Sequence, residues 1–166
     1  MHPLLTSLLF ALAAAVAGDP VRSATVEGKG GHGVVVLRSD GGVTRRVAAK
    51  GDAMQAILSP DRRVVAVVRG APVDGRWART ALELVTLRDG AVHTQRVEID
   101  QPFIRDLAFL DDARLVVDAG GMHFAGTLLL VDARSGAVRE RFSVVEGRGQ
   151  PEWAAAFERL RSAPAR

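Results

Sequence analysis

Short apolar runs separated by turn residues cover most of the chain from residue 23 onward. The clearest example is the stretch 57–70 (ILSPDRRVVAVVRG), where an apolar run, a Ser-Pro-Asp turn and an Arg pair precede a second β-branched run. Proline pre-sets φ for a turn, and the Asp that follows it can bond the backbone locally. The stretch therefore predicts two antiparallel strands joined by a tight turn.

This pattern repeats along the chain. A looser copy lies at 108–121 (AFLDDARLVVDAGG), with Asp112 standing 51 residues after Asp61. Hairpin signals recur in the same way, because the Gly-Ala-Val that begins at Gly90 returns 46 residues later at Gly136. A period of roughly 40–50 residues with four short strands is typical of β-propeller blades. We expect about two and a half copies of a four-stranded unit.

The predicted fold class is all-β, with antiparallel four-stranded blade-like sheets (partial β-propeller-like) and a short C-terminal helix. Turn signals bound each predicted strand, and the residues 69–79 and 119–125 are expected to be loops. The predicted strands are 23–27, 34–38, 43–48, 54–58, 63–68, 80–87, 91–99, 104–110, 113–117, 126–132 and 137–144.

The period changes in the tail. Residues 151–161 (PEWAAAFERLR) place Trp153, Phe157 and Leu160 at i, i+4 and i+7, on one face of a helix that can begin at Pro151. We expect this helix to pack its aromatic face on the sheets or to cap an open edge. The alternative is a helix that binds a partner.

The N-terminus predicts an exported protein. Residues 4–17 (LLTSLLFALAAAVA) form an uncharged apolar run that is shorter than the roughly 20 residues of a membrane-spanning helix. Small residues at Ala15 and Ala17 match a signal-peptidase pattern with cleavage before Gly18. The segment preceding the run lacks Lys and Arg, so an uncleaved membrane anchor or a buried helix remains the alternative.

Cleavage there leaves no stable membrane span and places the mature chain in the periplasm or outside the cell. The expected organisation is a signal peptide at 1–17, a β-propeller-like domain at 18–148 and a helical tail at 149–166.

Composition narrows the function classes. The formal net charge is +3, and the basic residues are scattered among 19 acidic ones. Nucleic-acid binding needs a basic patch or stripe, so a nucleic-acid partner is not expected. The chain has no cysteine, which excludes disulfides, thiolate metal sites and a lipid anchor on cysteine.

The turn motifs resemble the repeat of TolB-like (WD40-like) β-propellers, over roughly residues 23–145. The residues that carry the resemblance are Ser59-Pro60-Asp61, the strands at 64–68 and 84–90, and the Asp-x-x-Ser-Gly hairpin at 132–136. The chain departs from that repeat at Arg62, where glycine is usual, at 110–112, and in lacking a Trp-Asp pair. The resemblance implies blade-like sheets and no particular activity.

Propellers close with 4–8 blades, and this chain supplies fewer than three. Three outcomes are open. The chain is a curved, partly open β structure capped by the tail helix, or it self-assembles into a closed ring, or it is a fragment of a longer propeller.

Loops on one side are the candidate binding surface. In a blade-like unit, the loop between the second and third strands emerges on the same side as the blade-to-blade loop. Aromatic residues and arginine on exposed loops are typical of binding hot spots; the alternative is that Trp77 and Phe124 only cover the ends of their sheets. The candidate residues are Lys29, His32, Asp74, Arg76, Trp77, Arg79, Phe103, His123 and Phe124.

No catalytic or metal-binding motif is evident, and no cofactor is expected. The glycines around Lys29 lead into a strand, not into the helix that a phosphate-binding loop requires, and the histidines lack metal-ligand spacing. We therefore predict a binding or scaffold module that contacts another protein, or associates with itself through open sheet edges. The alternatives are a hydrolase-type enzyme or accessory domain on a propeller-like scaffold, or a self-assembling structural protein.

Overall fold

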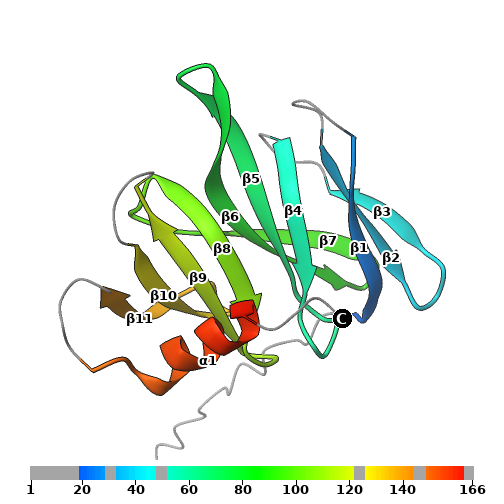
Figure 1. Cartoon of the computed structure of the whole chain (residues 1–166). Helices are drawn as coiled ribbons and strands as arrows, with labels where there is room; N and C mark the ends of the chain where they lie inside the picture. Colours follow the sequence, from blue (N-terminus) through cyan, green and yellow to red (C-terminus); the bar gives the residue numbers. More distant parts are fainter. Residues whose placement is uncertain (1–18, 29–32, 48–51, 122–125, 144–148, 163–166) are drawn as a thin grey trace, which may run out of the picture.

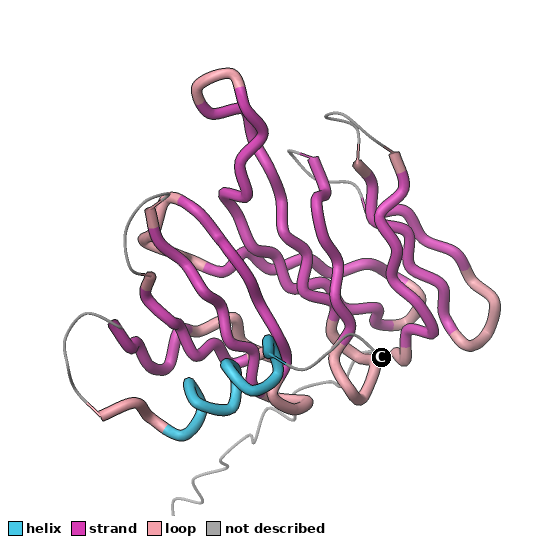
Figure 2. Tube along the Cα trace, viewed as in Figure 1, coloured by secondary structure: helices cyan, strands magenta, loops and turns pink. Residues whose placement is uncertain are grey.

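The computed structural model describes residues 19–28, 33–47, 52–121, 126–143 and 149–162 (Figures 1 and 2). In these residues the chain forms three antiparallel sheets and one helix, which confirms the all-β class. The first sheet has three strands, in the order β1-β2-β3, and the other two have four, in the orders β4-β5-β6-β7 and β11-β10-β9-β8. Every sheet is a meander, in which each strand pairs with its neighbour in sequence.

The strand bounds follow the predicted apolar runs closely except in β5 and β6, which extend further than predicted. The first sheet holds β1 (Val21–Glu27), β2 (Val34–Ser39) and β3 (Thr44–Val47). The second sheet holds β4 (Asp52–Leu58), β5 (Val65–Val73), β6 (Arg76–Arg88) and β7 (Ala91–Val97). The third sheet holds β8 (Phe103–Phe109), β9 (Arg114–Gly120), β10 (Thr127–Asp132) and β11 (Val138–Ser143), and the helix α1 spans Glu152–Ser162.

The three sheets and α1 pack in sequence order, with a hydrophobic core between each neighbouring pair. In β5, Val65 and Val67 face the first sheet, whereas Ala66 and Val68 face the third. Successive side chains of a strand point to opposite faces, so a strand buried on both sides needs a continuous apolar run. That is why residues 64–68 are uninterrupted Val and Ala.

The helix covers the outer face of the third sheet. Trp153, Ala154 and Phe157 pack against Val116 and Leu128, and the Trp153 indole donates a hydrogen bond to Glu140 at 2.8 Å. The expected packing of the aromatic face of the helix on a sheet is therefore observed. Leu160 was expected on the same buried face, but its side chain is 50% exposed. None of the helices in the described residues is long and apolar enough to span a membrane.

The Ser-Pro-Asp turn joins β4 to β5, as expected. The hydroxyl of Ser59 is buried, accepts hydrogen bonds from the amides of Arg63 and Val64, and donates one to Asp61 at 2.7 Å. The backbone amide of Asp61 in turn donates a hydrogen bond to the side-chain carboxylate of Asp112, in the turn between β8 and β9, at 2.8 Å. The two repeated turns therefore touch each other.

Candidate interaction surface

A two-stranded ribbon projects from the second sheet, at the top of Figure 1. β4 pairs with β5 only as far as Gly70, and β7 pairs with β6 only as far as Leu82. Beyond those points β5 and β6 pair only with each other, up to Val73 opposite Arg76. We define the ribbon as residues 71–79, and the ribbon end as the end of the sheets from which it projects.

The ribbon corrects one prediction, since residues 69–79 were expected to be a long loop. The loop consists of Asp74 and Gly75 alone, with φ of 48° and 75°. Positive φ at both positions defines the tight turn whose twist suits a two-residue hairpin, and Asp-Gly is a preferred pair for it. Two strands can therefore continue where the composition predicts irregular structure.

Exposed apolar side chains gather on one face of the ribbon. Trp77 is 44% exposed and stands opposite Pro72, which is also exposed. Met54, which is 39% exposed, lies across Gly70 at the base of the ribbon. Paired residues share a face, and Gly70 follows Val68 by two positions, so this apolar surface faces the third sheet. These exposed aromatic and sulfur-containing residues make this face of the ribbon the candidate interaction surface.

Arg79 fixes the base of the ribbon. One of its terminal nitrogens donates to the carbonyl oxygen of Arg105 in β8 at 2.7 Å, and the other donates to the Gln55 side chain in β4. Burial lowers the pKa of Arg79, an effect that the nearby Asp106 carboxylate opposes. The predicted site residue Arg79 therefore ties two sheets together and holds the ribbon in place.

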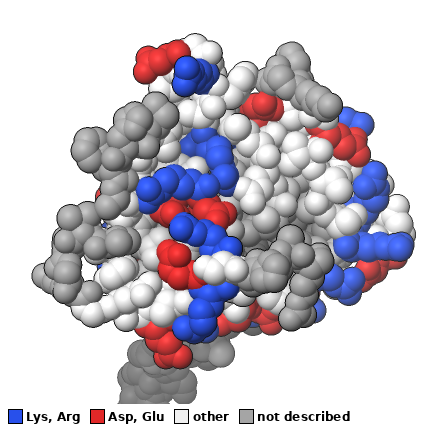
Figure 3. Space-filling view, in the orientation of Figure 1, with Lys and Arg blue, Asp and Glu red and all other residues white. Residues whose placement is uncertain are grey.

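Charged side chains of both signs continue from there between the third sheet and α1, and Figure 3 shows a column of charge down the middle of the view. Asp118 is buried and accepts hydrogen bonds from Arg105 at 2.6 Å and from Arg161 of α1 at 3.2 Å. A groove of about 590 Å³ lies over these residues. A Cβ at Gly126 would overlap the Arg105 guanidinium, so any larger residue there would require the Arg105 side chain to shift.

The other predicted site residues divide into two groups. Asp74 and Arg76 are exposed at the tip of the ribbon, and Phe103 is half-buried as the first residue of β8. Four predicted residues lie outside the described residues, and these are Lys29, His32, His123 and Phe124.

Sequence reasoning missed four residues of this surface, and these are Met54, Gln55, Arg105 and Asp118. Of these four, only Asp118 could have been suspected from the sequence, because it is a charged residue that interrupts the apolar run of β9. Met54 lies within, and Gln55 directly after, a register shift between β4 and β5, which no local pattern marks.

The opposite end of the sheets, which we call the turn end, uses its polar groups internally. The amide of Gly90 donates to Asp19, and the Arg45 side chain donates to the Gly90 carbonyl oxygen at 3.0 Å. Arg62 pairs with Asp40 at 3.1 Å across two sheets. These bonds hold neighbouring sheets together, so the turn end has a structural role.

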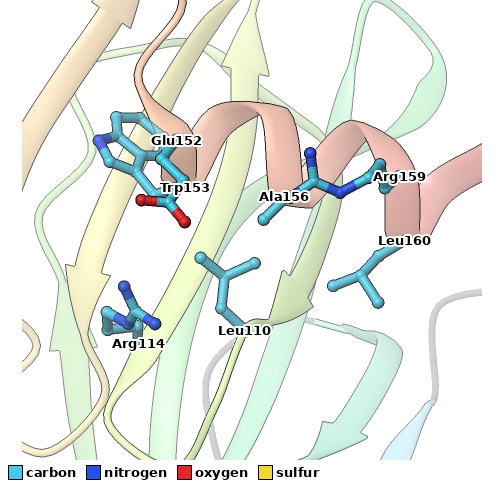
Figure 4. Close-up of a pocket in the computed structure, with 7 residues that line it drawn as sticks. All are labelled: Leu110, Arg114, Glu152, Trp153, Ala156, Arg159 and Leu160. Atoms are coloured by element: carbon cyan, nitrogen blue, oxygen red, sulfur yellow. The ribbon is translucent and has the colours of Figure 1, made fainter.

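A hollow of about 480 Å³ lies beside α1 (Figure 4). Its lining combines Leu110, from the segment that joins β8 to β9, and Arg114, the first residue of β9, with side chains along the helix. Arg114 is already paired with Asp111 at 2.7 Å. We interpret the hollow as the solvent-filled seam left where α1 covers the third sheet.

The described residues hold no group of three or more His, Asp or Glu side chains that could bind a metal ion. The ribbon end presents an indole, a thioether and arginines on a two-stranded, hydrogen-bonded ribbon. The class defined by this fold and surface is an all-β protein of three stacked meander sheets with a helical cap. No protein-family model, curated protein or solved structure matches the chain.

Proposed function

We propose that the protein is an exported, non-enzymatic binding module that contacts another protein through its ribbon end. The observation that carries the proposal is the exposed Trp77 beside Pro72 and Met54, on a ribbon that Arg79 anchors. Trp and Arg are enriched among residues that dominate binding energy. A ribbon whose strands are already hydrogen-bonded to each other also loses less conformational entropy on binding than an irregular loop would.

The contrast between the two ends supports the same proposal. At the turn end, the side chains of Arg45, Arg62 and Gln95 bond to neighbouring segments of the same chain. At the ribbon end, Asp74, Arg76 and Trp77 are exposed to solvent. Side chains that are free to contact a second molecule therefore gather at the ribbon end.

Export and the propeller-like relationship belong to this proposal as well. The apolar run at 4–17 and the small residues before Gly18 support secretion. The meander sheets, stacked face to face, are compatible with the TolB-like repeat that the turns resemble. Many unrelated functions share such folds, so the site and not the fold carries the functional argument.

A site-specific photo-cross-linker tests the proposal in the cells that make the protein. Benzoylphenylalanine in place of Trp77 is expected to give one discrete adduct with another protein. Val43 is the matched control position, because it is apolar, 40% exposed and located at the turn end. The intact mass of the protein that has not been cross-linked also reports whether the chain begins at Gly18.

An adduct at position 77 and none at position 43 is the expected result. With the captured partner purified, Trp77→Ala should weaken binding at least tenfold, as for a hot-spot aromatic residue. No adduct at either position, or equal adducts at both, would contradict a binding role for the ribbon end.

A further inference from the structure

The two-residue turn determines which backbone groups of the ribbon point outward. Val73 and Arg76 flank the turn, so they exchange hydrogen bonds with each other across the ribbon. Bonded and non-bonded pairs alternate in an antiparallel ladder. Trp77 and Arg79 therefore belong to non-bonded pairs, and their N–H and C=O groups point away from β5. Two details agree with this assignment. Pro72, which pairs with Trp77, has no N–H and so could not take part in a bonded pair. Gly70, which pairs with Arg79, faces Asp52 of β4 on its other side, so its own N–H and C=O groups also point away from β6.

The β5 edge of the ribbon is closed to a further strand. The outward groups of Gly70 face Asp52 of β4. Pro72 presents a carbonyl oxygen without a donor, and proline at such a position blocks strand addition. An incoming strand would find no alternating donors and acceptors along this side.

The β6 edge is open. β7 ends at Val97, opposite Leu82, and leaves the edge beyond it uncovered by any described strand. Outside the ribbon, no backbone group of the described residues bonds to the main-chain N–H or C=O groups of Trp77 or Arg79. These two residues thus present two donors and two acceptors in a row, which is the template for β-strand addition.

Charge selects the occupant of this edge. Arg76 and Arg79 are the basic residues of the ribbon, and Asp74 is its one acidic residue. A second copy of the chain would bring the arginines of two ribbons together, and like charges on paired strands are destabilising. An acidic strand would instead face Arg76, while apolar side chains on its other face would pack on Trp77.

We propose that the β6 edge at Trp77 and Arg79 accepts an extended segment of a partner protein, in which acidic and β-branched residues alternate. The segment adds one strand to the ribbon, and its main chain forms the hydrogen bonds that the edge leaves open. This inference rests on the proposed function, because it specifies how the ribbon end would hold its partner.

A blocked synthetic peptide with the sequence Ac-EVEVEV-NH2 is the probe, and Ac-KVKVKV-NH2 is the matched control. Amide hydrogen exchange, measured by NMR on the purified protein, reads the edge directly. With the acidic peptide, the amides of Trp77 and Arg79 should exchange at least tenfold more slowly. Those of Arg76 and Ala78 point inward and should change little. No slowing at Trp77 and Arg79, or equal slowing with the lysine peptide, would overturn the proposal.

A pair of substitutions separates main-chain from side-chain binding. Arg79→Thr and Arg79→Pro both remove the guanidinium, but only proline also removes the outward N–H. The proline variant should bind the acidic peptide at least tenfold more weakly than the threonine variant. Unchanged resonances outside residues 70–82 would show that both variants remain folded.

Equal affinities of the two variants would overturn strand addition. If the photo-cross-link at position 77 still formed in cells, the proposed function would stand and its partner would bind through side chains alone. If no cross-link formed at position 77 but the acidic peptide still slowed the exchange of the Trp77 and Arg79 amides, the proposed function would be wrong. The β6 edge would nevertheless accept an acidic strand.

Discussion

Asp132 shows how a single carboxylate stabilises a repeated turn. It accepts the amides of Arg134 at 3.0 Å and Ser135 at 2.9 Å, and it pairs with the Arg139 guanidinium at 2.9 Å. Burial by itself would raise the pKa of Asp132, but these hydrogen bonds outweigh it and lower the pKa from 3.8 to about 2. The folded protein therefore prefers the charged form.

This shift predicts the pH dependence of stability. Because the folded pKa lies below the unfolded one, the stabilisation is fully present above about pH 4 and is lost as pH falls through about 2. Solvent screens this partly exposed group, so we expect Asp132→Asn to cost about 1 kcal/mol at pH 7. The cost should vanish near pH 2 in urea unfolding curves.

Asp89 provides the control, since it occupies the equivalent hairpin of the second sheet with a φ of 51° that Asn also tolerates. Asp89→Asn corrects for the general effect of removing a surface carboxylate. If the difference between the two variants were the same at pH 7 and pH 2, the hydrogen bonds would not be the source of the stabilisation.

At the scale of elements, α1 is held by two aromatic residues. Phe157 is 1% exposed and Trp153 is 7% exposed in the core between α1 and the third sheet. Phe157→Ala leaves a cavity there and should lower the free energy of unfolding by about 3–5 kcal/mol. Leu160→Ala, on the same helix but half-exposed, should change it by less than about 0.5 kcal/mol. Chemical denaturation checks both values, and similar costs at the two positions would mean that α1 packs differently.

An element could be predicted from the sequence where residues close to it in the chain determine it. Alternation and turn chemistry are local, so the strands around the Ser59 and Asp89 turns were predicted within a few residues. The ribbon was missed because Arg69 suggests the end of a strand. Its side chain is in fact 3% exposed and paired with Glu83 at 2.9 Å, a partner 14 residues away. The helix was predicted from its period, and only the exposure of Leu160 was wrong.

The candidate site was predictable to the same extent. Exposed residues at the ribbon tip follow from composition, so Asp74, Arg76 and Trp77 were identified. The contacts of Arg79 with Arg105 and Gln55 join three separate strands. They depend on how the sheets stack, which no local pattern encodes.

At the scale of the whole molecule, one outer face of the stack of sheets is covered by α1 and the other carries paired charges. α1 covers the third sheet. On the first sheet, Glu27 pairs with Arg38 at 3.4 Å and with Arg46 at 3.5 Å. Those side chains share a face with Val36, which is only 2% exposed. A closed ring of several chains would need apolar outer faces that stack on one another, as the inner faces do.

We therefore expect a monomer in light scattering at micromolar concentration. Replacing Glu27 and Arg46 with valine would turn the outer face of the first sheet apolar, and that double variant should associate, which makes it the positive control. A wild-type mass of two or more chains would show that the charged face does not prevent stacking. A mass of one chain for the wild type and a larger mass for the variant would locate the barrier to assembly in this ion-pair cluster. The ribbon end would then be the surface that remains for a partner.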